Sequence, residues 1–305
     1  YKVYNDTRIL EYMYAGMEKF MAFQEDASTN FLRPGAGNNW GDWLSVNQNT
    51  SDDFVGAAYY GYDAKLMISI AEALGKTDDV KKYRELFQNI KKAFTKAYIL
   101  EDGFITEDTQ TSYALALFFD LYPEHLAKQG AMYLEERIVA NDFKFSSGFL
   151  GTKHVMLALA KYGFHDLAYK LFKQTEYPSW GYSVVNGSTS IWERWNSFTK
   201  NDTKNSDLNA KMNSFSHYAL GAVTEWMFRH AVGIASEDAG YRNIIIRPAF
   251  SKEMDFIKGS HESINGTIAS AWNWDNDTLL LNIEIPVNTK AKVYIPTTDI
   301  SKIKE

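Results

Sequence analysis

Residues 189–198, TSIWERWNSF, place a glutamate and an arginine between two tryptophans. An indole ring is costly to leave in water, and a carboxylate is costly to bury without partners. Glu193 therefore has two interpretations. It forms an ion pair with Arg194 or with a more distant lysine, or it lies in an aromatic-walled cavity. In such a cavity desolvation raises the pKa of a carboxyl toward the range that suits a general base.

Four other segments carry more tryptophan, acid or histidine than helix connections usually need, since a few polar residues and a glycine are enough there. These segments are NNWGDWL (38–44), SSGFLGT (146–152), YPSWGY (177–182) and MNSFSHY (212–218). In a ring of helical hairpins, the loops at one end meet at the axial cavity. We therefore expect these loops to bind a ligand together.

Each candidate residue in these loops also has a structural interpretation. Asp42 is predicted either to bind a ligand or to cap a helix N-terminus. Trp43, Trp180 and Trp192 could be core residues, but their loop-like, glycine-rich settings favour the walls of a cavity. His217 lies at the start of a predicted helix. It is either a hydrogen-bonded structural group or a donor to a sugar hydroxyl.

Composition and motifs exclude several function classes. The net charge of −6 and the absence of a basic run argue against nucleic-acid binding, and no stretch approaches the roughly 20 apolar residues of a membrane span. The chain has no cysteine, its six histidines are scattered, and it contains no GxxxxGK[ST], GxGxxG, HExxH or GxSxG motif. No metal site or cofactor is therefore predicted. An aromatic share of 15% favours carbohydrate, because aromatic walls suit the apolar faces of sugar rings.

Helical periodicity dominates the first three-quarters of the chain. Apolar residues recur at helical spacing over residues 7–23, 53–74, 79–98, 108–121, 123–140, 152–162, 165–175 and 212–232. Paired helices joined by short turns predict an array or toroid of α/α hairpins.

The pattern changes at Gly233. Short β-branched runs with period-two alternation follow, namely YRNIIIRP, GTIASAWNW, DTLLLNIEIP and KAKVYIP. They predict four or five antiparallel strands. We therefore expect a helical domain over residues 1–235 and a small β-sandwich over residues 236–305.

Five longer motifs occur in a fixed order: GDWL, DTQTSYALAL, SSGFLGTKHVMLALA, TEYPSWGYSVVNGSTSIWERW and MNSFSHYALGAVTEWMFRHAVGI. Together they resemble the α-L-rhamnosidases of glycoside hydrolase family 78. Each motif alone is weak, but five in order across nearly the whole chain are specific. The resemblance implies an (α/α)6 toroid followed by a C-terminal β-sandwich. It also implies inverting hydrolysis of terminal α-L-rhamnosyl residues of glycosides or polysaccharides.

The resemblance also assigns roles to residues. It makes Glu193 the general base that activates water, gives Trp43 a contact with the sugar and gives His217 a hydrogen bond to a hydroxyl. Trp180 and Trp192 become further walls of the same pocket. The family's general acid belongs to an acidic motif upstream, which this sequence lacks. We therefore expect a toroid truncated on its N-terminal side, with the acid on missing N-terminal domains of the same polypeptide, and an inactive fragment.

Two other functions stay open. The first is an (α/α)6 hydrolase of another sugar, which would prefer an aryl fucoside or glucoside to the rhamnoside. The second is a sugar-binding or scaffold protein that keeps the aromatic pocket and binds rhamnose without hydrolysing it. The sequence does not determine linkage preference or compartment, although a periplasmic or secreted location is favoured over a cytoplasmic one.

Overall fold

The computed structural model describes residues 1–35, 40–198 and 213–304. They form two compact units, one of residues Thr7–Val223 and one of residues Tyr1–Asp6 and Thr224–Glu305. Asn38, Asn39 and Met212, which belong to predicted ligand loops, lie outside the described residues. Within the described ranges, none of the helices combines the length and the apolar character needed to cross a bilayer.

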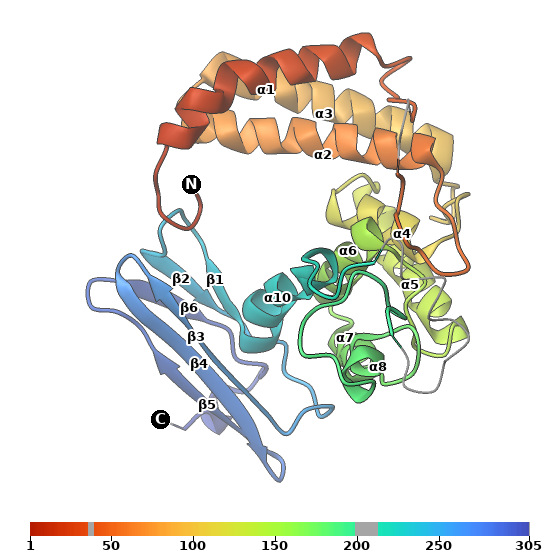
Figure 1. Ribbon diagram of the computed structural model, residues 1–305. Helices are drawn as coiled ribbons and strands as arrows, with labels where there is room; N and C mark the ends of the chain where they lie inside the picture. Colours follow the sequence, from red (N-terminus) through yellow and green to blue (C-terminus); the bar gives the residue numbers. More distant parts are fainter. Residues whose placement is uncertain (36–39, 199–212, 305) are drawn as a thin grey trace. The chain divides into compact units, whose positions relative to one another are not determined.

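The larger unit consists of helical hairpins, as the apolar spacing predicts. Its helices are α1 (Arg8–Asp26), α2 (Asp52–Ala73), α3 (Thr77–Tyr98), α4 (Gln110–Phe118), α5 (Glu124–Ala140), α6 (Phe149–Lys161), α7 (His165–Lys173) and the short α8 (Trp180–Val185). Figure 1 shows α2 and α3 running side by side as one hairpin, with α1 next to them. Helices α4 and α5 pack as a second pair and α6 and α7 as a third, while α4 contacts both α2 and α6.

Two kinds of helix alternate in this unit. Residues 110–117 of α4 are all buried, whereas α3 buries one face through Tyr83, Ile90 and Phe94 and exposes the other. A helix that is buried all round must be covered on every side, but an amphipathic helix covers only one. Helices α2, α4 and α6 therefore form an inner layer, and the amphipathic α3 and α7 lie outside it.

Capping side chains explain where some helices begin. Helix α4 begins at Gln110, two residues later than predicted, because Thr109 and Ser112 form a capping box. The Thr109 hydroxyl accepts from the Ser112 amide, and the Ser112 hydroxyl accepts from the Thr109 amide. This arrangement satisfies two of the amides that have no partner inside a helix.

The long helix predicted over residues 212–232 is confirmed only from Ala219 to Val232. Residues 213–218 are not helical, and three short segments follow them. These are η1 (Ala219–Ala222), α10 (Val223–Trp226) and the π-helical η2 (Met227–Val232). Hydrogen bonds of a serine side chain favour a non-helical backbone in residues 213–218. The Ser214 hydroxyl accepts from the Ser216 amide and donates to the Ser216 carbonyl. Such local side-chain bonds compete with helical backbone bonds.

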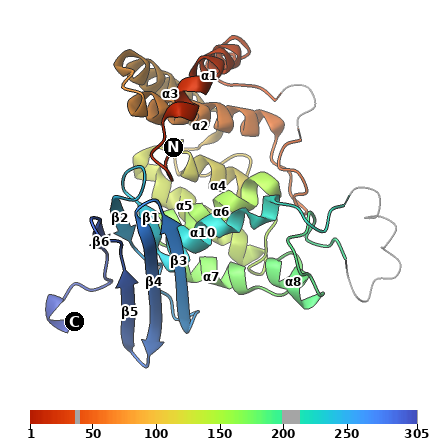
Figure 2. The ribbon, with the colours of Figure 1, turned by 60° about the vertical axis from the view of Figure 1, so that its left-hand side comes forward.

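The smaller unit contains two three-stranded sheets. One sheet has the order β1 (Ile234–Ser236), β2 (Asn243–Ile246) and β6 (Lys290–Val293), and the other has β3 (Phe256–Ser263), β4 (Gly266–Asp275) and β5 (Thr278–Glu284). Figure 2 shows β3, β4 and β5 lying side by side. Side chains of both sheets, including Ile244, Ile246 and Ile268, share one hydrophobic core.

The strand predictions hold for β2, β4, β5 and β6, but the sequence patterns did not mark β1 and β3. Three of the four strand pairs are antiparallel as predicted, and the β2–β6 pair is parallel. A parallel pair needs a long connection between its strands. Here the whole β3–β4–β5 sheet supplies it.

Asp63 of α2 is a partly buried acid. Burial raises the pKa of its carboxyl to about 6, and a hydrogen bond from the Gln24 amide nitrogen, 3.3 Å from Oδ2, opposes this shift. The Asp63 carboxyl therefore binds its proton more tightly in the folded state than in the unfolded state. The associated stability is fully present below the unfolded pKa of about 4 and is lost as the pH rises through the folded value of about 6.

The Asp63→Asn variant should remove this pH dependence. We expect its free energy of unfolding to exceed that of the parent chain by about 1–2 kcal/mol near pH 7.5, with no gain near pH 4. Asp277→Asn is the matched control, because the Asp277 side chain is fully exposed. Urea unfolding at both pH values measures the effect, and an equal gain at the two values would contradict the assignment.

Candidate active site

Asp42 lies in the loop before α2 and is only 4% exposed. Its Oδ1 accepts from the amides of Leu150 and Gly151, both at 2.9 Å, and its Oδ2 accepts from the Gly148 amide at 2.7 Å and from the Thr111 hydroxyl. These amides belong to the N-terminus of α6, so Asp42 caps a helix that is remote in sequence. All four lone-pair sites of the carboxylate are used.

The electrostatics of Asp42 follow from this enclosure. Burial raises the pKa of the Asp42 carboxyl, and the hydrogen bonds from Thr111 and the three amides act in the opposite direction. Since the carboxylate oxygens bind protein groups, we interpret Asp42 as a positioning residue rather than as a direct sugar ligand. Of the two roles predicted for Asp42, ligand binding and helix capping, this arrangement corresponds to helix capping. The helix that Asp42 caps is α6.

Two glycines allow α6 to approach its neighbours closely, Gly148 at the Asp42 loop and Gly151 at Thr111 of α4. A Cβ atom at Gly148 would lie 2.2 Å from the Trp43 carbonyl oxygen, and one at Gly151 would lie 2.1 Å from Thr111 Oγ1. Any larger residue at either position would have to push these groups away, so the two glycines of SSGFLGT are needed for these two contacts.

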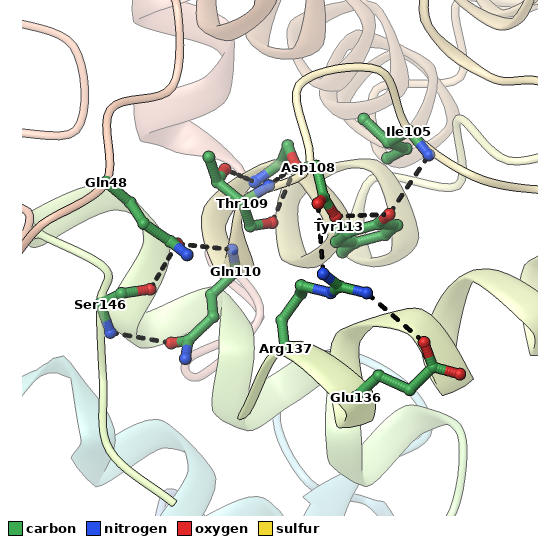
Figure 3. A network of polar contacts seen from close by, with 10 residues as sticks. Gln48, Ile105, Asp108, Thr109, Gln110, Tyr113, Glu136, Arg137 and Ser146 are labelled. Atoms are coloured by element: carbon green, nitrogen blue, oxygen red, sulfur yellow. Dashed lines mark hydrogen bonds and ion pairs between the residues drawn. The ribbon is translucent and has the colours of Figure 1, made fainter. Parts of the chain in front are cut away.

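A second network holds the other end of the Asp42 loop (Figure 3). Gln48 Oε1 accepts from the Gln110 amide at 3.3 Å and from the Ser146 hydroxyl at 2.6 Å, and Gln110 Oε1 accepts from the Ser146 amide at 3.0 Å. The start of α4 is tied to α5 in turn, because Arg137 pairs with Asp108 at 3.3 Å. The loop is therefore fixed between α4 and the segment that precedes α6.

These anchors place Trp43 in the wall of a hollow of about 370 Å³, lined by Trp40, Gly41, Trp43, Phe149 and Leu150. The rings of Trp40 and Trp43 meet edge to face, with their centroids 4.9 Å apart. The Trp43 carbonyl accepts from the Phe149 amide at 3.0 Å. Such an aromatic wall suits the apolar face of a sugar ring.

His217 extends this wall. Its ring centroid lies 4.9 Å from that of Phe149. The Ala219 amide donates to His217 Nδ1 at 3.3 Å, so the proton of the neutral ring is on Nε2. Nε2 is then a hydrogen-bond donor, which a sugar hydroxyl can accept.

Glu193 lies on a segment that pairs with the segment of His217. Its amide donates to the Ser214 carbonyl at 2.9 Å, and its Oε2 accepts from the Ser214 amide at 2.7 Å. The His217 amide donates to the Ile191 carbonyl at 2.8 Å. Among the described residues, Oε1 of Glu193 has no hydrogen-bond partner, and Arg194 does not form an ion pair with it. One carboxylate oxygen is thus held, and the other is available.

Trp180 and Trp192 lie at a second hollow, of about 390 Å³. It shares no lining residue with the hollow of Trp43. The indole N–H of Trp180 donates to the Leu220 carbonyl at 3.0 Å, while Trp192 is 5% exposed and its ring meets that of Phe215. The structure thus brings Trp43, His217 and Glu193 into one chain of contacts and places these two tryptophans at a different hollow.

Sequence reasoning missed three residues of this arrangement: Thr111, Phe149 and Ser214. Phe149 is the one ring in SSGFLGT, and this signal could have marked it as a wall. Thr111 contributes a hydroxyl to Asp42 and Ser214 contributes a backbone amide to Glu193. These roles depend on tertiary contacts, and no local pattern reveals them.

Known domains match the chain from end to end. The bacterial α-L-rhamnosidase six-hairpin glycosidase domain matches residues 1–231, and the bacterial α-L-rhamnosidase C-terminal domain matches residues 233–305. The chain belongs to the bacterial α-L-rhamnosidase family. The resemblance found in the sequence is confirmed, and so is the predicted fold class, a six-hairpin glycosidase fold followed by a small β-domain.

The relatives of this rhamnosidase-family chain are much longer than the chain itself. It is 37% identical over 304 residues to an α-L-rhamnosidase of Streptomyces avermitilis and 38% identical over 316 residues to one of Formosa agariphila. Both matches cover all of this chain but only 29% and 34% of those proteins. The chain therefore spans about a third of the length of these curated relatives.

Solved rhamnosidase structures have the same fold. The S. avermitilis α-L-rhamnosidase in complex with L-rhamnose has a TM-score of 0.90 at 37% identity, over 98% of this chain and 28% of that one. The native α-L-rhamnosidase of Aspergillus terreus also has a TM-score of 0.90, at 31% identity, over 97% of this chain and 35% of that one.

Proposed function

We propose that this chain carries the water-activating half of an α-L-rhamnosidase, which removes terminal α-L-rhamnosyl residues with inversion of configuration. One observation carries the proposal: Glu193 has one held and one available carboxylate oxygen, on a segment paired with that of His217. The ring of His217 in turn continues the wall formed by Trp43 and Phe149. Family membership and a relative solved with L-rhamnose support rhamnose as the sugar.

In the proposed reaction, Oε1 of Glu193 takes a proton from a water molecule. The water oxygen bonds to the anomeric carbon while the bond from that carbon to the leaving oxygen breaks on the opposite face. The Ser214 amide holds Oε2, so the carboxylate keeps one orientation throughout. Trp43 and Phe149 contact the apolar face of the sugar, and His217 Nε2 donates to a hydroxyl.

The leaving oxygen needs a proton from a second carboxyl, which in inverting glycosidases lies about 6.5–9.5 Å from the base. Asp42 does not suit this role, because both of its oxygens accept hydrogen bonds from the protein. We propose that the acid belongs to a segment outside this chain, as the resemblance implies. The chain alone then has a base without its acid, and we expect it to be inactive.

Hydrolysis of an aryl α-L-rhamnoside by the full-length protein tests the proposal. Proton NMR in the first minutes should show β-L-rhamnose as the initial product, because inversion converts the α-glycoside into the β-anomer. The isolated chain should be at least about 100-fold slower, since it lacks one of the two carboxyl groups.

Three outcomes would contradict the proposal. If the α-anomer forms first, the configuration is retained. If an aryl fucoside or glucoside is clearly preferred, the sugar is a different one. If the full-length protein binds rhamnose without turnover, it is a sugar-binding protein.

A further inference from the structure

We propose that the second hollow is a separate binding site for a neutral sugar ring. Its lining combines the indoles of Trp180, Trp192 and Trp195 with four serine and threonine side chains between residues 183 and 190. None of the residues that line it belongs to the Trp43 hollow. The inference concerns binding alone, so it does not depend on Glu193 acting as a base.

Packing fixes the aromatic wall before any ligand arrives. The Trp180 and Trp195 rings meet edge to face with centroids 5.4 Å apart, and Trp195 stacks on Phe145 at 5.5 Å and 11°. The hydrogen bond from the Trp180 indole to the Leu220 carbonyl holds that ring as well. A wall that is already ordered loses little conformational entropy when a ligand binds.

The polar groups of the hollow are only partly used. The Ser188 hydroxyl donates to the Ser190 carbonyl and the Ser190 hydroxyl donates to the Phe215 carbonyl, so both oxygens keep lone pairs for a donor. Trp195 is 3% exposed, and its indole N–H finds no acceptor in the part of the chain that the structure describes. A well-matched ligand therefore offers hydrogen-bond donors and an acceptor beside an apolar surface.

Charge and size define the ligand further. The residues that line the hollow are all uncharged, which disfavours a carboxylate, phosphate or amine. Its volume of about 390 Å³ falls within the range of roughly 300–1,000 Å³ that is typical of small-molecule sites. A neutral pyranoside has one apolar ring face and hydroxyls that both donate and accept, so it fits all of these features.

Two neighbouring valines of α8 provide a matched pair of variants. Val184 and Val185 are both exposed, at 66% and 57%, but only Val184 lines the hollow. Val184→Glu places a charge in the wall and removes apolar surface from it. Val185→Glu adds the same charge one residue away. We expect the first change to weaken sugar binding at this site at least about tenfold, and the second to leave it unchanged.

Equilibrium dialysis of labelled methyl α-L-rhamnoside against the full-length protein with Glu193→Gln counts the sites. We expect two bound sugars per chain, with one lost when Val184→Glu is added and none lost with Val185→Glu. Trp43→Ala should remove the other site. The number of bound sugars therefore measures binding at the second hollow independently of hydrolysis.

Several results would overturn the proposal. The first is that Val184→Glu leaves the number of bound sugars unchanged. The second is that only one sugar binds and Trp43→Ala removes it. The third is that no saturable binding is seen. Displacement of the second sugar by 4-nitrophenol at equal or lower concentration would show that the hollow is an apolar slot rather than a sugar site.

Discussion

Glu193→Gln in the full-length protein should lower kcat for an aryl α-L-rhamnoside about 10²–10⁴-fold, with KM changed only a few-fold. The glutamine carbonyl can still accept the hydrogen bond from the Ser214 amide, so the loop keeps its geometry. It cannot take a proton from water, so the attacking oxygen stays a weak nucleophile. Initial rates at saturating and at low substrate concentration separate kcat from KM.

Glu176→Gln is the matched control for this prediction. Glu176 pairs with Lys144 at 2.6 Å, and its side chain is 72% exposed. Exposed ion pairs contribute little to stability, and we expect turnover within twofold of the parent. Near-normal turnover by Glu193→Gln would remove the base assignment. If the melting curve of Glu193→Gln shows that activity is lost because folded protein is lost, the base assignment is removed as well.

Asp42→Asn should lower the free energy of unfolding by about 2–4 kcal/mol and reduce kcat/KM at least about tenfold. Each oxygen of this carboxylate accepts two hydrogen bonds. An asparagine presents its NH₂ group to two of these donors whichever way the amide turns, so buried donors lose their acceptor. The loop that carries Trp43 then loses these contacts with the N-terminus of α6, which carries Phe149.

Thr111→Val supplies the graded control for Asp42. It removes one of the four donors and should cost about 1 kcal/mol of stability, with a correspondingly smaller effect on the rate. Urea unfolding and rhamnoside hydrolysis measure the two quantities on the same samples. If Asp42→Asn leaves the stability intact and raises KM alone, Asp42 binds the sugar directly and is not a positioning residue.

The helical part of the fold follows closely from the sequence. The predicted helix over 53–74 is α2 at Asp52–Ala73, and the one over 79–98 is α3 at Thr77–Tyr98. The first is a long, strongly apolar run that ends before Gly75, and the second has a clear helical period of apolar residues. The prediction failed over residues 213–218, because the backbone amides of Ser214 and His217 donate to Glu193 and Ile191 of another segment instead of to a helical turn.

The candidate site was predictable only in part. Glu193, Trp43 and His217 could be singled out because their types and motif order are specific, and the structure links them through Phe149 and Ser214. The use of Asp42 as a cap for α6 could not be read from the sequence, since the amides it binds lie in a different segment. The placement of Trp180 and Trp192 at another hollow is likewise a matter of packing.

The hydrogen bonds between Asp42 and the N-terminus of α6 also bear on the synthesis of the chain. The Asp42 carboxylate meets amides 106 to 109 residues further along. Contacts of such long range form late, because loop closure must come first. We therefore expect Trp43 to lack this anchor, and the Trp43 hollow to be incomplete, until the segment up to Gly151 has left the ribosome. We expect a prematurely released product that stops before α6 to lack this part of the sugar site as well.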